Sequence, residues 1–197
     1  MPVLCYTNCD TVELFLNGKS VGLQGYWFPR MGFWPLQGDE GRSHVLRTTS
    51  DLHLAWTVPY QPGTLRAVGT KDGKVVATVE VTTTGEPAAI ELSVDREAIA
   101  ADRREVAHAV VKILDAQGRV VPDADNEVSF EIFGEGKLIG LDNGDPASLE
   151  DFKGSRRKAF NGLALAIVQS TAKSGQIRLT AASPGLRSSS VIINTKA

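Results

Sequence analysis

The sequence predicts an all-β protein built from two tandem immunoglobulin-like β-sandwiches, residues 1–86 and 87–197. Apolar residues recur at every second position through many short segments, as they do in half-buried strands. Asn-Gly and Asp-Gly pairs separate several of these segments, and such pairs are strong signals for tight β-hairpins. The length of 197 residues suits one or two domains, and a hydrophobic content of 42% is enough for packed cores.

The first half contains two predicted hairpins and one further half-buried strand. One hairpin turns at Asn17-Gly18 and the other at Asp72-Gly73, because these residue pairs accept the backbone of a tight turn. The further strand ends at Pro59, which cannot donate a hydrogen bond within a sheet. The predicted strands are residues 12–16, 19–22, 52–58, 65–69 and 75–83.

The boundary between the two domains is predicted at residues 82–87, where a strand-like segment ends in Thr-Thr-Thr-Gly-Glu-Pro. Residues 84–87 offer few side chains able to pack, so we expect this linker to be open to proteolysis. Seven predicted strands follow, which is enough for a second sandwich. They are residues 90–94, 107–114, 128–133, 137–141, 163–170, 177–182 and 188–193.

One segment of the second half fits this pattern less well. Residues 95–111 are rich in Ala, Glu and Arg, and their intrinsic propensity alone favours a helix. From Val106 onward the residues are β-branched and alternating, and tertiary context often overrides propensity. We therefore expect a strand here and keep the helix as the alternative.

Composition excludes several classes of protein. Lys and Arg number 21 against 23 Asp and Glu, a net charge of -2, so the basic surface of a nucleic-acid-binding protein is missing. No apolar run approaches the roughly 20 residues that a membrane helix needs. No signal peptide is visible, and the strand-like start directly after Met1 indicates a piece of a longer protein.

Metal, cofactor and disulfide chemistry have little support in the sequence. Cys5 and Cys9 are too far apart for a disulfide unless the chain turns sharply between them, so we expect two reduced thiols. The three histidines are scattered, and no spacing resembles a zinc site. A group of carboxylates could hold calcium but does not match the helix-loop-helix signature, so we expect no metal and no cofactor. This group is Asp142, Asp145, Glu150 and Asp151.

The most distinctive segment is residues 143–170, NGDPASLEDFKGSRRKAFNGLALAIVQS. A polar loop of this length between two strands is usually functional or interfacial. Its basic cluster, 153–158, lies beside Glu150 and Asp151, which predicts a solvated, locally paired loop, with an anion site as the alternative. The amino-acid sequence of this segment resembles the last domain of bacterial family 2 glycoside hydrolases, the β-galactosidase group.

The resemblance extends over most of the chain. Residues 6–22 and 56–73 resemble the immunoglobulin-like domain that follows the catalytic barrel in many of these enzymes. Residues 88–186 resemble the next, C-terminal domain, through Asp95-Arg96, the string VVPDADN at 120–126 and the loop described above. Two departures stand out. Arg103 takes a position where the family usually has Gly, and residues 23–51 form a longer, more aromatic excursion than in the family.

The resemblance implies a place in a larger enzyme and no active site in this chain. Retaining glycosidases use two carboxylates about 5 Å apart, here expected on a barrel of roughly 250 residues, which this chain is too short to contain. The expected partners are therefore the catalytic barrel and N-terminal domains of a parent enzyme, and no nucleic acid or membrane. The resemblance implies a bacterial parent in the periplasm or outside the cell, whereas the compartment of this chain stays undetermined.

Two segments are candidates for binding. The first carries five aromatic residues, which could pack in the core, contact another domain or subunit, or hold an oligosaccharide. It comprises Tyr26, Trp27, Phe28, Phe33 and Trp34. The second is the long loop, whose candidate contacts are Asn143, Asp145, Arg156 and Arg157. The favoured interpretation is a non-catalytic accessory region that braces or extends the barrel; the rivals are a carbohydrate-binding module and, more weakly, adhesion-like stacking of domains.

Overall fold

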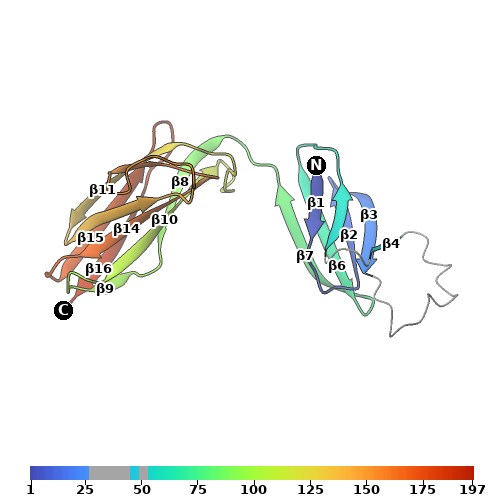
Figure 1. Ribbon diagram of the computed structural model, residues 1–197, viewed down its shortest axis with the longest axis horizontal. Coiled ribbons are helices and arrows are strands. Elements are labelled where there is room, and N and C mark those ends of the chain that lie inside the picture. The colour runs from blue at the N-terminus through green and yellow to red at the C-terminus, as the bar shows by residue number, and fades with distance from the viewer. Residues whose placement is uncertain (27–44, 49–52) are drawn as a thin grey trace. The chain divides into compact units, whose positions relative to one another are not determined.

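The computed structural model describes residues 1–26, 45–48 and 53–197, and its secondary structure is entirely β there (Figure 1). The chain forms two compact units, Met1–Thr83 and Thr84–Ala197. Each unit has strands in two sheets around its own core, so the prediction of two tandem β-sandwiches is confirmed. The division at residues 86 and 87 into independent domains stays a prediction.

The first unit pairs a five-stranded sheet with a two-stranded sheet. The larger sheet has the order β4-β3-β2-β6-β7, and the smaller one pairs β1 with β5. All neighbours are antiparallel except β3 and β4, which run parallel. The strands are β1 Pro2–Cys5, β2 Thr11–Leu16, β3 Lys19–Tyr26, β4 Val45–Thr48, β5 Leu54–Thr57, β6 Thr64–Lys71 and β7 Lys74–Thr82.

Both predicted hairpins are present. Asn17 and Gly18 have φ values of 50° and 79°, and Asp72 and Gly73 have 49° and 73°, as a primed turn requires. The alternation on β2 and β5 buries one face of each strand. These faces form a small core, Cys9, Val12, Leu14, Leu16, Leu54, Trp56 and Val58.

Two side chains tie the sheets of the first unit together. Gln24 on β3 is buried, and its amide donates to the carbonyl of Ala55 at 2.6 Å and accepts from the Ala55 N–H at 3.2 Å. The indole of Trp56 donates to the carbonyl of Gly22 at 3.1 Å. Strand β5 is therefore held against β3. The expected excursion over residues 23–51 is wrong in part, because β3 continues to Tyr26 and Val45–Thr48 form β4. Its other residues lie outside the described ranges.

The second unit pairs a four-stranded sheet, β12-β14-β10-β8, with a five-stranded sheet, β13-β11-β15-β16-β9. Neighbouring strands are antiparallel, except that β9 runs parallel to β16. The strands are β8 Pro87–Val94, β9 Ala98–Ala100, β10 Val106–Asp115, β11 Glu127–Gly134, β12 Gly136–Asp142, β13 Arg156–Lys158, β14 Leu163–Ser170, β15 Gly175–Ala182 and β16 Ser189–Lys196.

All seven predicted strands of the second half are present, and two short ones were missed, β9 and β13. Residues 95–111 contain no helix, and the strand interpretation is confirmed from Val106. The family's glycine position is occupied by Arg103 with a φ of 62°, in the left-handed region that favours glycine. Asp102 supports this turn, since its Oδ1 accepts from the N–H groups of Arg104 and Glu105 at 2.8 Å each.

Both cysteines are free thiols, with Cys9 buried in the core of the first unit. Burial raises the pKa of the Cys5 thiol, and the neighbouring Cys9 raises it further, so Cys5 is a poor nucleophile at neutral pH. Within the part of the chain that the structure describes, no helix has the length and hydrophobicity to cross a membrane.

Candidate functional site

The predicted aromatic site falls largely outside the described residues. Tyr26 ends β3. Trp27, Phe28, Phe33 and Trp34 lie outside the described ranges, so their proposed contacts with a sugar or with another domain stay predictions.

The second predicted site, the loop after β12, is organised by its own short polar side chains. Asp142 Oδ1 accepts from the N–H groups of Asn143 at 2.7 Å and Gly144 at 3.2 Å. The hydrogen bond from Gly144 lowers the pKa of Asp142 most, and the hydrogen bond from Asn143 and the nearby Arg157 guanidinium lower it further. Burial opposes them, but the pKa stays below its usual value. Asn143 Oδ1 in turn accepts from the N–H of Asp145 at 3.0 Å. The loop is therefore a series of hydrogen-bonded turns.

Arg157 is the centre of this loop. The prediction of a solvated basic cluster is confirmed for Lys153, Arg156 and Lys158, which are exposed, and is wrong for Arg157. Its side chain is 0% exposed, although its neighbour Arg156 is 69% exposed. Strand alternation explains the contrast, because Arg157 on β13 lies opposite the fully buried Val128 on β11. The prediction that the cluster is locally paired holds for Arg157, whose partners come from the loop and from Asp142 at the end of β12.

The guanidinium of Arg157 joins both ends of the loop. Nη1 donates to the carbonyl of Glu150 and Nη2 to Oδ1 of Asn143, each at 3.0 Å. Nη2 also lies 3.5 Å from Asp142 Oδ1, and Nε lies 3.7 Å from Glu150 Oε2 without a hydrogen bond. Its carbon Cζ lies 4.9 Å from the ring centre of Phe152. The structure thus brings Asn143 and Arg157 together, with Asp145 beside them.

The loop displays two apolar side chains to solvent. Leu149 is fully exposed and the ring of Phe152 is 57% exposed. The backbone below Phe152 is fixed, since the N–H of Leu141 on β12 donates to the Phe152 carbonyl at 2.7 Å. Whether this loop, including Arg156, contacts another domain stays a prediction. The arrangement offers positioned apolar contacts and no constellation of reacting groups.

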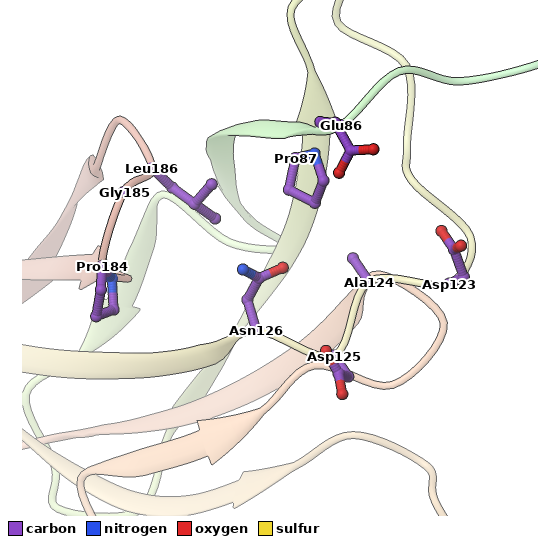
Figure 2. Close-up of a pocket in the computed structure, with 9 residues that line it drawn as sticks. All are labelled: Glu86, Pro87, Asp123, Ala124, Asp125, Asn126, Pro184, Gly185 and Leu186. Carbon is purple, nitrogen blue, oxygen red and sulfur yellow. The ribbon is translucent and has the colours of Figure 1, made fainter.

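A cavity of about 420 Å³ lies at the end of the second unit where the chain enters it. Figure 2 shows Glu86 and Pro87 at the start of β8, facing a loop and a turn that complete the lining. These are residues 123–126, inside the string VVPDADN, and residues 184–186. The lining carries three carboxylates, and among the described residues no group of His, Cys, Asp or Glu is arranged to hold a metal ion. An acidic cavity of this kind is not by itself a binding site.

Gly85, the linker residue that precedes Glu86 at this cavity, is hydrogen-bonded to the second unit. The carboxylate of Asp115 is fully buried and accepts from the N–H of Gly85 at 3.0 Å and from Arg119 Nε at 2.8 Å. Burial raises the pKa of Asp115, but hydrogen bonds from the backbones of Gly85 and Arg119 and from the Arg119 side chain outweigh it and lower the pKa to about 2. Sequence reasoning missed this role, because the contact joins Asp115 to a residue 30 positions earlier in the chain.

Family models match both halves of the chain. Residues 90–192 match the family model described as glycoside hydrolase family 2 C-terminal domain 5. Residues 1–77 match a domain of unknown function, DUF4982.

The similar proteins are much longer than this chain. The β-galactosidase BoGH2A of Bacteroides ovatus is 41% identical over 184 residues, 93% of this chain and 19% of that protein. A β-galactosidase of Thermoanaerobacter pseudethanolicus is 33% identical over 98% of this chain and 24% of that protein.

Among solved structures, a glycosyl hydrolase family 2 member from Bacteroides cellulosilyticus is similar with a TM-score of 0.84 and 32% identity. That match covers all of this chain and 23% of the other. A β-glycosidase from Bacteroides vulgatus gives a TM-score of 0.81 at 31% identity, over 98% of this chain and 22% of the other. The chain therefore spans about a fifth to a quarter of the length of these four proteins.

Proposed function

Because this chain belongs to glycoside hydrolase family 2, in which its second half is C-terminal domain 5, we propose that it is a non-catalytic accessory region of a larger glycoside hydrolase. Its role is to brace or extend the catalytic part of that enzyme. The parent is a bacterial hydrolase of β-galactosidase type, as the names of the two relatives suggest.

One observation supports this proposal most directly: the matched region is nearly all of this chain but only a small part of each relative. Relatives match 93% and 98% of this chain, but the matched region is only 19% and 24% of their own length. A catalytic barrel of the kind expected for a retaining glycosidase takes roughly 250 residues. The described part of this chain is occupied by two β-sandwiches. The two carboxylates that act on the glycosidic bond therefore belong in the remainder of the parent.

The structure supports a bracing role through what it displays. The loop after β12 is held by a buried arginine and by side-chain-capped turns, and it presents Leu149 and Phe152 to solvent. Ordering a loop costs roughly 1–2 kcal/mol per residue in lost backbone entropy, so an ordered loop with exposed apolar tips is suited to contact with a neighbour. The partners proposed are the other domains of the parent polypeptide.

The test compares the parent enzyme with a form that lacks the residues corresponding to this chain. The isolated chain should not hydrolyse an aryl β-galactoside. The shortened parent should lose activity on heating faster than the intact parent, or fail to fold. Equal rates of thermal inactivation, with equal kcat/KM, would contradict the bracing role. Turnover by the isolated chain that a point mutation within it abolishes would contradict the non-catalytic assignment.

A further inference from the structure

Strand β7 is exposed along its length, and one of its faces continues the core of the first unit. In register across the larger sheet, Leu14 of β2 lies beside Ala67 of β6, which lies beside Val79 of β7. A second row runs in the same way from Leu16 through Leu65 to Val81. Because cross-strand neighbours share a face, Val79 and Val81 lie on the face that carries the buried Leu14 and Leu16.

The two-stranded sheet covers only part of this face. Its strand β5 is fixed to β3 by the Gln24 and Trp56 hydrogen bonds, and β2 and β6 separate β3 from β7. Burial follows this geometry, since Leu14 is 2% exposed whereas Val79 and Val81 are 62% and 66% exposed. Among residues 1–26, 45–48 and 53–83, the two-stranded sheet thus leaves the face of β7 uncovered, and the apolar strip is Ala77, Val79 and Val81.

We propose that this apolar strip is a docking surface for another domain of the parent polypeptide, an inference that rests on the proposed function. An apolar sheet face at a sheet edge invites aggregation unless something covers it. About four fifths of the relatives' length lies outside the matched region, and that polypeptide supplies a covering domain at high effective concentration.

The geometry also indicates how the partner docks. The register of β7 against β6 shifts between Gly69 and Thr70, a bulge that disturbs the edge close to the hairpin turn. Addition of a further strand along the whole of β7 is therefore disfavoured, and the partner packs on the face. Lys71 and Lys74 are paired in register at the hairpin end of the strip. The partner surface that fits is apolar, with carboxylates at the side facing these lysines.

The test places charge on the strip and, as a control, on the opposite face of the same strand. Val79→Lys combined with Val81→Lys should leave the urea unfolding of the isolated 197-residue chain unchanged, because both side chains are already exposed. In the parent enzyme the same double variant should shorten the half-life at an elevated temperature about tenfold, since lysines would be buried in an apolar interface. Thr78→Lys, opposite Val68 on the other face, should change neither measurement.

Each other outcome has a distinct meaning. Equal half-lives for the strip variant and the Thr78→Lys control in the parent would overturn the proposal. If the isolated chain forms a dimer by light scattering and the strip variant restores the monomer, the occupant is a second copy and the proposal is wrong. If removing the whole region destabilises the parent while the strip variant does not, the bracing role is supported and the proposed docking surface is wrong. If removal has no effect, the proposed function itself fails.

Discussion

Replacing Arg157 tests whether one buried side chain holds the loop after β12. Arg157→Ala removes two hydrogen bonds from a charged donor, to Glu150 and Asn143, each contributing about 1.5–3 kcal/mol. The contact with the Phe152 ring adds about 0.5 kcal/mol, because the ring is more than half exposed. These contributions sum to about 3.5–6.5 kcal/mol. Removal of one partner of a buried charged pair usually costs about 3–5 kcal/mol, so we expect the second unit to lose roughly 3.5–5 kcal/mol.

Two further substitutions show whether charge or geometry is responsible. Arg157→Lys keeps the positive charge but loses the planar fork, so we expect an intermediate loss of about 1–3 kcal/mol. Arg156→Ala is the matched control, because Arg156 is 69% exposed and its ion pair, from Nη1 to Glu127 Oε1 at 3.6 Å, lies on the surface. This substitution should cost less than about 0.5 kcal/mol. Only the buried arginine depends on the fork for its contacts.

The assay uses the uneven distribution of chromophores. All 3 Trp and all 3 Tyr precede residue 84, so tryptophan fluorescence reports on the first unit alone while far-ultraviolet circular dichroism reports on both. Arg157→Ala should lower the urea midpoint of the dichroism transition by about 1–3 M and leave the fluorescence transition in place. A shift no larger than that of Arg156→Ala would refute the reasoning that the buried guanidinium organises the loop.

Two other predictions follow from single residues of the second unit. Asp115 has a folded-state pKa of about 2, below its unfolded value near 4, so its contribution is fully present above pH 4 and is lost as the pH falls toward 2. The stability of the second unit, measured as the urea midpoint by circular dichroism, should therefore fall between about pH 4 and pH 2. In Asp115→Asn this midpoint should depend less on pH over the same range. Arg103→Gly should stabilise the second unit by roughly 0.5–1 kcal/mol in urea unfolding, because it relieves a left-handed φ of 62°; a destabilisation would contradict this.

Much of the fold could be predicted because the signals are local. Alternation on β2 and β5 and the primed turns at Asn17-Gly18 and Asp72-Gly73 need only neighbouring residues. The segment 95–111 was harder, because its composition favours a helix while its place between two sheets requires strands. The sequence motif at residues 143–170 was enough to suggest the family that the comparisons identify.

The role of Arg157 could not be read from composition, because an Arg-Arg-Lys run is usually solvated. One signal was available. In the run Arg156 to Phe160, the buried and exposed positions alternate, with Arg157 and Ala159 inside, and a strand there would have placed one arginine inward. Recognising the strand requires knowing that it pairs with β11, more than twenty residues earlier, which no local pattern reveals.

The predicted linker at residues 82–87 stays untested as a site of proteolysis, but hydrogen bonds on either side of it can be described. In the structure the N–H of Thr83 donates to the carbonyl of Gly63 at 2.9 Å, and the N–H of Gly63 donates to Thr83 Oγ1 at 3.1 Å. Two residues later, the N–H of Gly85 donates to the buried Asp115 carboxylate at 3.0 Å. Thr84 therefore lies between two residues whose N–H groups are each hydrogen-bonded within their own unit.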